Sequence, residues 1–395
     1  MANVKIVVGA NFGDEGKGLM TDYFCHAAIK KGEDCLVVCS NGGAQRGHTV
    51  NTPDGKRHVF HHFGSGTLVG TDTYLCSEYI LNPMIFRQEY DELAEMGIAP
   101  RIYVNRKCLW TTPYDMMINQ IIEEYRGENR HGSCGVGIWE TIIRSNLLFL
   151  DVQAAYACDR NILKRILSTY RDDYMKFRFK ELGLKDISDE WNEVIKSESL
   201  LERYIDDFYF MMSRVSVVDD EILKRYQTIV FENGQGLLLH QNAEEYGVHT
   251  TPSNTGIENP MYVMSGILEN PDVEVCYVTR TYLTRHGAGK FEGECPVEEI
   301  NPDIYDETNI SNIHQGAIRY GKMDTQLLLN RISDDFIIAD DDWKKSLAVT
   351  HMNETDGRFA DVNQTLVNDV IKQLKFECCY ESYGRTRNDV NKIIV

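Results

Sequence analysis

Short apolar runs rich in Val and Ile recur along the chain, with longer stretches of helical periodicity between them. Each run is a few residues long, which is typical of buried strands. The predicted strands are Val4–Val8, Cys35–Val38, Ile102–Val104, Ile229–Phe231, Val273–Val278, Phe336–Ile338 and Leu347–Val349. The clearest predicted helices are Gly18–Lys31, Pro83–Met96 and Val362–Phe376. Strands that alternate with helices in this way predict an α/β fold with a large, mostly parallel sheet flanked by helices.

One segment, at about 159–220, departs from this alternation. It is dense in charged and aromatic residues at helical spacing and has almost no Gly or Pro. We therefore expect a helical insertion there. The sequence contains no Pro/Ser-rich linker, low-complexity tract or internal repeat, so we expect a single domain over residues 1–395.

Composition narrows the classes of partner. The 395 residues are 43% hydrophobic and 26% charged, as in globular proteins with a substantial core. Asp and Glu number 60 against 41 Lys and Arg, a net charge of −19. An acidic protein repels phosphate backbones and anionic lipid, so we expect neither nucleic acid nor membrane as a partner. Any phosphate must be held by a local concentration of Lys, Arg and backbone amides.

The cysteines and the first residues bear on location. The 11 cysteines are scattered and form no C-x-x-C pair, which favours reduced thiols over zinc or a disulfide framework. The chain enters a strand-like run directly and has no apolar stretch of the roughly 20 residues that a membrane helix needs. We therefore expect a cytoplasmic protein.

The first predicted strand runs into a glycine-rich loop, Gly9 to Gly18, that contains Lys17 and precedes a helix. Backbone amides and a helix N-terminus in this arrangement bind phosphates. The spacing is not that of a Walker A motif, and Gly18 stands where Ser or Thr would hold magnesium. Asp14 is unusual in an anion site, because a carboxylate repels phosphate unless it holds a metal or acts as a base. The alternative is an ordinary turn in which Asp14 caps the helix.

The second predicted strand runs into another glycine-rich loop, which carries Arg46 and His48. The carboxyl ends of parallel strands lie together at one edge of a sheet. Asp14 and His48 could then face each other across a ligand, although a histidine considered by itself is more often structural.

Further loops with polar tips follow other predicted elements. They are the runs 131–138, 231–237, 250–256 and 284–291. Ordinary turn chemistry explains any one of them, but several such loops after strands indicate a composite site.

These motifs, in this order, resemble the adenylosuccinate synthetase family. The matching blocks are G-D-E-G-K-G, G-G-x-x-x-G-H-T, G-x-x-G-x-G-I, F-E-x-x-Q-G-x-L-L, S-N-T and T-R-x-G-A-G-x-F. The resemblance implies a homodimeric ligase that joins IMP to L-aspartate at the expense of a nucleoside triphosphate, with Mg²⁺. It also implies a large, mostly parallel α/β sheet of P-loop-like nucleotide-binding architecture.

The resemblance implies roles for particular residues. Asp14 would take the proton from ring nitrogen 1, so that the 6-oxyanion attacks the γ-phosphorus. Asp14 and the Gly47 carbonyl would hold magnesium. His48 would stabilise the transferring phosphoryl, Lys17 would contact phosphate, and Gln235 would contact the purine. The aspartate amine would then displace phosphate from carbon 6.

The implied binding residues form three sets. The purine monophosphate would contact Asn11, Gly13, Asp14, Gln45, Arg46, Cys134, Gln235 and Thr251. The amino acid would contact Arg319, Thr49 and Lys322. The triphosphate would contact Gly13, Glu15, Gly16, Lys17, Gly18, Gly47, His48, Thr49, His351, Asn353, Ser382 and Gly384.

Departures from the family pattern leave substrates open. The family's guanine-reading T-K-x-D is replaced by a run that ends in Asn353, whose amide fits adenine, so ATP or dATP could replace GTP. Of the family's arginine-rich aspartate loop only Arg319 remains. The arginine that the family lends to a partner subunit has no secure match, and Arg144 is the nearest candidate.

Two alternatives remain beside a generic NTPase, which the missing Walker Ser or Thr argues against. The tail 382–390 resembles the phage 2-aminoadenylosuccinate synthetases, which take (d)GMP in place of IMP. That branch characteristically lacks the Asp that this chain keeps at position 14, so IMP is the preferred interpretation. A nucleotide-binding regulatory protein with weak catalysis is the other alternative, because several substrate arginines are missing.

Overall fold

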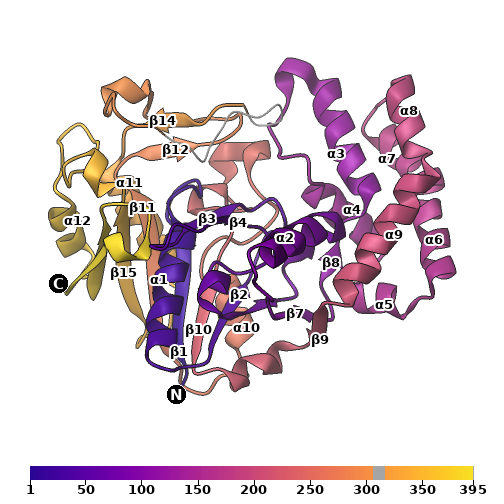
Figure 1. Cartoon of the computed structure of the whole chain (residues 1–395). Coiled ribbons are helices and arrows are strands. Elements are labelled where there is room, and N and C mark those ends of the chain that lie inside the picture. The colour runs from indigo at the N-terminus through magenta and orange to yellow at the C-terminus, as the bar shows by residue number, and fades with distance from the viewer. Residues whose placement is uncertain (306–315, 395) are drawn as a thin grey trace.

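A ten-stranded sheet forms the centre of the computed structural model, which describes residues 1–305 and 316–394 (Figure 1). From one edge to the other its strands are β17 (Val390–Ile394), β16 (Cys378–Ser382), β15 (Lys344–Thr350), β11 (Asp272–Arg280), β1 (Asn3–Gly9), β10 (Thr228–Glu232), β2 (Cys35–Cys39), β5 (Asp72–Leu75), β7 (Ile102–Asn105) and β9 (Val215–Val218). All neighbouring pairs in this sheet are parallel except β16 and β17. The expected mostly parallel α/β sheet is confirmed.

The central strands are apolar because both faces of the sheet are covered. Successive side chains of a strand point to opposite faces. On β1, Val4, Ile6 and Val8 pack into one hydrophobic cluster, whereas Val7 packs with residues of α1 (Lys17–Lys30) in another. Continuous burial on two faces explains why these strands appear as unbroken apolar runs.

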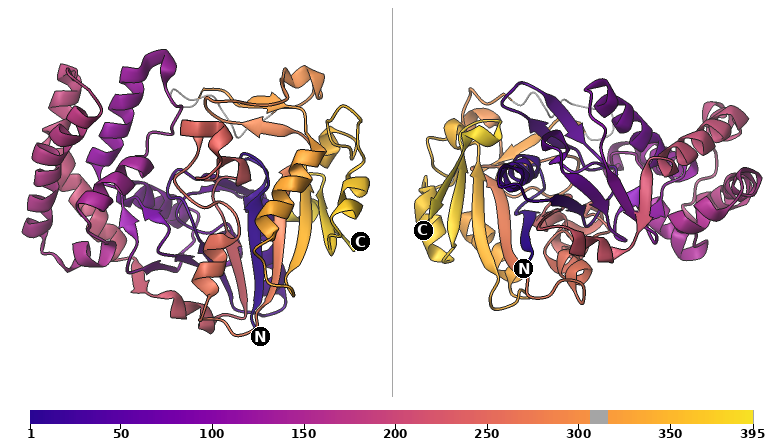
Figure 2. Two further views of the ribbon diagram at one scale, coloured as in Figure 1. Left: turned by 180° about the vertical axis from the view of Figure 1, so that it is seen from behind. Right: turned by 60° about the horizontal axis from the view of Figure 1, so that its bottom comes forward.

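Helices cover the sheet and extend beyond one edge of it. The other helices are α2 (Pro83–Glu95), α3 (Pro113–Arg126), α4 (Ile138–Leu147), α5 (Val152–Ala157), α6 (Arg160–Thr169), α7 (Met175–Glu181), α8 (Asp189–Ile195), α9 (Glu198–Met212), α10 (Glu258–Met264), α11 (Thr325–Phe336) and α12 (Val367–Gln373). Helices α3 to α9 gather on the side of β7 and β9, as all three ribbon views show (Figures 1 and 2). The segment predicted as an insertion, about 159–220, contains α6 to α9 but also the edge strand β9.

The structure corrects two predicted elements. Phe336–Ile338 is not a strand: Phe336 ends α11, and Ile337 and Ile338 are exposed. Leu328, Leu329 and Ile332 are buried at helical spacing, and the apolar run lies at the end of this helix. The helix predicted over Val362–Phe376 forms only as α12, because Asp361 accepts hydrogen bonds from the Asn363 and Thr365 amides and turns the chain first. The other predicted strands and helices form at or near their expected positions.

Short sheets stand above the carboxyl edge of the main sheet. They pair β3 (His48–Asn51) with β4 (Arg57–Phe60), β6 (Ile80–Leu81) with β8 (Leu109–Trp110), and β14 (Arg319–Gly321) with both β12 (Leu283–Arg285) and β13 (Glu294–Cys295). The loops that follow β1, β2, β10, β11 and β15 all open at this edge, which is where ligands bind in open α/β sheets.

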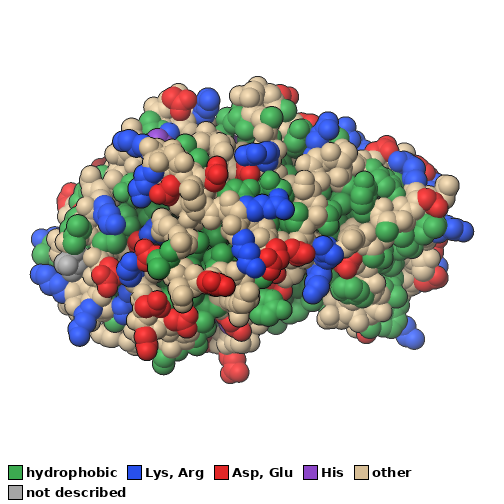
Figure 3. All heavy atoms as spheres, turned by 90° about the horizontal axis from the view of Figure 1, so that it is seen from below, with side chains coloured by type: hydrophobic (Ala, Val, Ile, Leu, Met, Phe, Trp, Pro, Cys, Tyr) green, Lys and Arg blue, Asp and Glu red, His purple; other side chains and the backbone are tan. Residues whose placement is uncertain are grey.

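The surface is mixed in charge on the face seen from below, where acidic and basic side chains alternate (Figure 3). Within residues 1–305 and 316–394, no helix has both the length and the apolar character that crossing a membrane requires.

Candidate active site

The loop after β1 forms a backbone turn in front of α1. Gly13 and Gly16 have φ values of 111° and 99°, in the left-handed region that favours glycine. A Cβ on Gly13 would lie 2.8 Å from the Gln235 carbonyl carbon, so the loops after β1 and β10 are in close backbone contact. Gly16 is the N-cap of α1, and no side chain caps the helix or places a negative charge in its first turn. This helix end is therefore open to an anion.

Lys17 and Glu15 lie beneath this turn. The Lys17 ammonium donates to the Gly13 carbonyl over 2.5 Å and lies 3.9 Å from Glu15, whose other oxygen accepts from the Gly13 amide. Both side chains are almost fully buried. Burial raises the pKa of Glu15 to about 7 and lowers the pKa of Lys17. A phosphate at the helix end would supply the negative charge that favours a charged Lys17.

The loop after β2 directs Arg46 and His48 to different partners. The Arg46 guanidinium turns inward: it donates to the carbonyls of His61 and Phe63 over 2.6 and 2.9 Å. The Arg46 side chain is 1% exposed and lines the larger of the two cavities described below. Its N–H groups, however, are hydrogen-bonded to the protein backbone. Contact of Arg46 with the purine monophosphate stays a prediction.

His48 is held by the carboxylate of Glu232, the last residue of β10. Its Nδ1 lies 2.8 Å from Glu232 Oε1, so Nδ1–H donates to the carboxylate. The Ser65 hydroxyl donates to the same oxygen, and the Ser65 amide donates to Oε2 over 3.1 Å. Burial by itself would raise the pKa of Glu232, but His48 and Arg46 lower it to about 2. Burial lowers the pKa of His48 to about 4, against the opposing pull of Glu232.

Two cavities open on either side of these loops. The larger has a volume of about 620 Å³ and the smaller about 250 Å³. Gly13, Asp14, Gly47 and His48 line both cavities, so Asp14 and His48 belong to a wall that separates two ligand-sized spaces. The structure thus places Asp14 and His48 at the same strand ends, and their meeting across a ligand stays a prediction.

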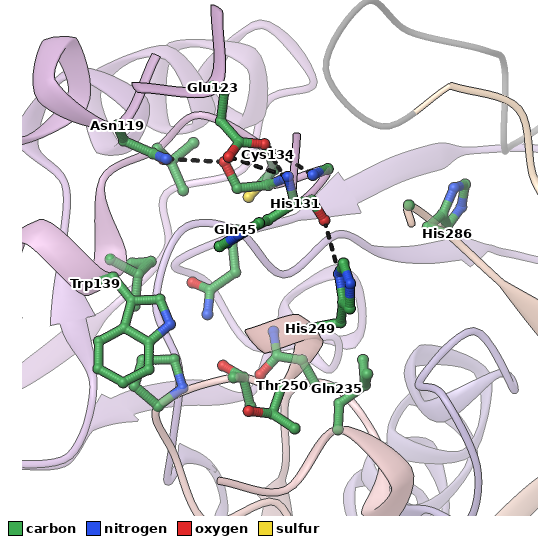
Figure 4. A pocket seen from close by; sticks show the side chains of 18 of the residues that line it. Gln45, Asn119, Glu123, His131, Cys134, Trp139, Gln235, His249, Thr250 and His286 are labelled. Atoms are coloured by element: carbon green, nitrogen blue, oxygen red, sulfur yellow. Dashed lines mark hydrogen bonds between the residues drawn. The ribbon is translucent and has the colours of Figure 1, made fainter. Parts of the chain in front are cut away.

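Most predicted site residues line one of these cavities. Gln45, Arg46, Cys134, Gln235 and Thr251 line the large cavity in addition to the shared wall. Gly16, Lys17, Gly18, Thr49, His351, Asn353 and Gly384 line the small cavity. In Figure 4 the amides of Gln45 and Gln235 point into the middle of the large cavity. The Gln235 backbone has φ 56°, which places its side chain there.

Other predicted residues lie outside both cavities. The Asn11 amide donates to Thr279 and accepts from Arg331, and the Ser382 hydroxyl donates to the Gly384 carbonyl. Glu15 is buried below the loop. Arg319 and Lys322 form ion pairs with Glu294 and Glu299, over 2.5 and 2.7 Å. Arg319 and Lys322, which were predicted to contact the amino acid, therefore lie outside the wall shared by the two cavities.

The prediction that Arg144 is the arginine that reaches a partner subunit is wrong. Its side chain is fully buried, with Nε 2.9 Å from Asp115 Oδ1 and Nη2 2.8 Å from the Trp110 carbonyl. The guanidinium also lies over the rings of Trp110 and Tyr170. Exposing it would break a buried ion pair, which typically costs about 3–5 kcal/mol.

Sequence reasoning missed several residues of the site. Glu232 belongs to the F-E-x-x-Q motif, but nothing in the sequence indicates that it forms a hydrogen bond with His48. His286 lies in the large cavity with Nε2 3.5 Å from Asp14 Oδ2. Arg280, whose Nε donates to the Asp14 carbonyl, lines the small cavity. Each comes from a strand end far away in the sequence, so only the fold brings them together.

Open glycine loops, a free helix end and two cavities with a common polar wall define an α/β protein of nucleotide-binding type. The model of the adenylosuccinate synthetase family matches residues 6–328, and the chain belongs to this family. It is 28% identical over 323 residues to the adenylosuccinate synthetase of Acaryochloris marina (80% of this chain, 66% of that protein). It is 30% identical over 305 residues to that of Nostoc punctiforme (74% and 63%). The matches thus span slightly less than two thirds of the length of these curated relatives.

Solved structures share the fold at low sequence identity. The fully ligated adenylosuccinate synthetase of Plasmodium falciparum superposes with a TM-score of 0.73 at 16% identity and covers 100% of both chains. The succinoaminodeoxyadenylate synthetase (PurZ) of cyanophage S-2L, bound to dGMP and dATP as an energy donor, has a TM-score of 0.65 at 15% identity, with 99% of this chain and 95% of that chain covered. Both likenesses concern the fold.

Proposed function

We propose that the chain is a ligase that joins IMP to L-aspartate, driven by a nucleoside triphosphate, to give adenylosuccinate. The observation that carries this proposal is the wall of Asp14 and His48 between the two cavities. The large cavity, with its inward-pointing glutamines, has room for a purine monophosphate. The small cavity, with Lys17 and the open end of α1, suits the triphosphate.

The first chemical step requires a base and a stabiliser for the transferring group. The 6-oxygen of hypoxanthine is a poor leaving group for an amine until it is phosphorylated. Asp14 takes the proton from ring nitrogen 1, and the 6-oxyanion attacks the γ-phosphorus from the large cavity. His48, Lys17 and the amides at the start of α1 stabilise negative charge on the transferring phosphoryl. The amine of aspartate then attacks carbon 6 and displaces phosphate.

Magnesium fits the oxygen atoms available at this wall. Asp14 and Gly47 line both cavities, and a carboxylate and a backbone carbonyl are hard oxygen ligands that suit Mg²⁺, whose other ligands would come from phosphates and water. Among the described residues no group of three or more His, Cys, Asp or Glu is arranged to hold a metal. Bound Mg²⁺ would neutralise charge on the triphosphate.

The experiment that tests the function is a matrix of monophosphates and donors. IMP, GMP and dGMP are each combined with ATP, dATP and GTP, with and without L-aspartate, and phosphate release and product mass are measured. We expect aspartate-dependent turnover of IMP. Turnover of GMP or dGMP without IMP would instead support 2-aminoadenylosuccinate synthesis, and nucleotide binding without aspartate-dependent release would support the regulatory alternative. Light scattering of the same sample would test the proposed homodimer.

Replacing Asn353 by Asp is expected to shift the donor preference from ATP towards GTP. Asn353 lines the small cavity and is exposed to a ligand there. A carboxylate accepts from the ring N–H and amino group of guanine, whereas the amide pairs with adenine. We expect the kcat/KM ratio of GTP to ATP to rise by about 10-fold or more. The matched control is Asn391→Asp on the exposed edge strand β17, which should leave the ratio unchanged.

Donor binding is expected to take up a proton at His48. Its pKa of about 4 leaves the ligand-free side chain neutral at pH 7, with the single proton on Nδ1 against Glu232. Nε2 can donate to phosphoryl oxygen only after protonation, which the charge of the triphosphate favours. Donor affinity should therefore fall as pH rises. Calorimetric titration in two buffers of different ionisation enthalpy measures the uptake, which His48→Asn should abolish; zero uptake by the unaltered protein would contradict the donor role.

A further inference from the structure

The loop that carries His286 is firmly held beside Asp14. It follows β12, and the Arg319 Nη1 donates to the carbonyls of Gly287 and Gly289 over 3.2 and 3.0 Å. A Cβ on Gly287 would lie 3.0 Å from the Gly132 carbonyl, so the loop is packed against the opposite wall of the large cavity. Arg319 thus supports this loop, while Glu294 fixes its guanidinium.

Asp14, the partner of His286 in this contact, is held in place through its backbone. Arg280 Nε donates to the backbone carbonyl of Asp14 over 2.5 Å. The His286 Nε2 then lies 3.5 Å from Asp14 Oδ2, within ion-pair distance, with the two side chains 19% and 31% exposed. His286 lines the large cavity and is absent from the lining of the small one. Figure 4 shows it at the side of the cavity, beyond His249. His286 therefore acts on the side of the Asp14 carboxylate that faces the large cavity, where the purine is proposed to bind.

The contact matters because hypoxanthine and guanine, both 6-oxopurines, differ next to ring nitrogen 1. Hypoxanthine presents one N–H at this edge, and guanine presents a second donor, the 2-amino group. A carboxylate with both oxygens available accepts both donors of guanine. The His286 imidazole stands 3.5 Å from Oδ2, so an approach of the 2-amino group to this oxygen would bring it against the imidazole edge instead of a free acceptor.

We propose that His286, from its position 3.5 Å from Oδ2 of Asp14, selects purine monophosphates that lack a 2-amino group. His286 is a positioning and specificity residue that acts through Asp14, and the inference rests on the proposed function. It deepens that function by assigning the choice between IMP and GMP to a residue outside the glycine loops of β1 and β2.

The test compares His286→Leu with His286→Gln. Gln places an N–H near the position of imidazole Nε2, whereas Leu fills similar space without a donor. Steady-state kinetics with saturating ATP and aspartate give kcat/KM for IMP and for GMP, and calorimetry gives the affinities of both without turnover. We expect His286→Leu to raise the GMP to IMP ratio by about 10-fold or more, as for loss of a hydrogen bond to a charged group. His286→Gln should restore the original ratio, and KM for ATP should not change.

The control is His26→Leu on α1, because His26 lines neither cavity. An unchanged ratio in His286→Leu, the same ratio in the Gln and Leu variants, or a preference of the unaltered protein for GMP would each overturn the inference. If His286→Leu does not fold, the Gln variant and the substrate preference of the unaltered protein still decide. Absence of aspartate-dependent turnover with every monophosphate would be a different result, since it overturns the proposed function itself.

Discussion

Asp14→Asn is expected to lower kcat for IMP-dependent phosphate release by about 10³-fold or more, since general bases contribute up to about 10⁴. The amide has nearly the shape of the carboxylate but cannot take the proton from ring nitrogen 1. The backbone of the loop should keep its place, because Arg280 holds the carbonyl and not the side chain of residue 14. Loss of a negative charge beside the open end of α1 should leave metal-free ATP bound as tightly or more tightly.

The measurement that isolates this step is positional isotope exchange. With ATP labelled at the β–γ bridge, IMP present and aspartate absent, reversible phosphoryl transfer scrambles the label. Asp14→Asn should abolish scrambling while calorimetry still detects ATP. The matched control is Asp34→Asn, which changes the net charge equally at an exposed position between α1 and β2. Scrambling at the normal rate in Asp14→Asn would mean that another group is the base.

The sequence predicted the sheet best where burial is complete on both faces. β1, β2, β10 and β11 are mainly apolar runs because, apart from Asn3, Lys5 and Asp272, all their residues are buried. β5 was missed, since its Asp72 is paired with Arg101 and the strand holds little apolar sequence. The prediction of a strand at Phe336–Ile338 failed for the opposite reason: these three apolar residues stand at the end of a helix whose buried positions are spaced by three and four, and the last two are exposed. A run of three apolar residues therefore does not distinguish a buried strand from the end of a helix.

The same contrast holds for the site. The glycine loops after β1 and β2 could be predicted, because positive φ and an anion at a helix end demand Gly at set positions. Arg319 could be recognised, but the sequence does not show that Glu294 and the carbonyls of Gly287 and Gly289 already engage it. Glu232 and His286 reach His48 and Asp14 from strands about 200 residues away or more, a pairing that depends on sheet order.

Glu232→Gln is expected both to destabilise the protein by about 3 kcal/mol or more and to lower kcat by about 100-fold. Glu232 is fully buried and acts only as an acceptor, for His48 Nδ1, for the hydroxyl and amide of Ser65, and towards Arg46 at 3.5 Å. Gln has one acceptor oxygen. Whichever way its amide is turned, the NH₂ group faces either the imidazole or the Ser65 amide and Arg46, all of which are donors.

The catalytic part of this effect can be separated from the structural part by Glu274→Gln. Glu274 is also a buried carboxylate on a central strand, where it accepts from Lys5, Ser346 and Tyr380, but it lines neither cavity. Both variants should lower the thermal unfolding temperature, measured by calorimetry. Only Glu232→Gln should also reduce kcat and proton uptake on donor binding, because only Glu232 keeps the proton of neutral His48 on Nδ1 and stabilises the imidazolium that faces phosphate. Equal kcat in the two variants would show that Glu232 supports the fold alone.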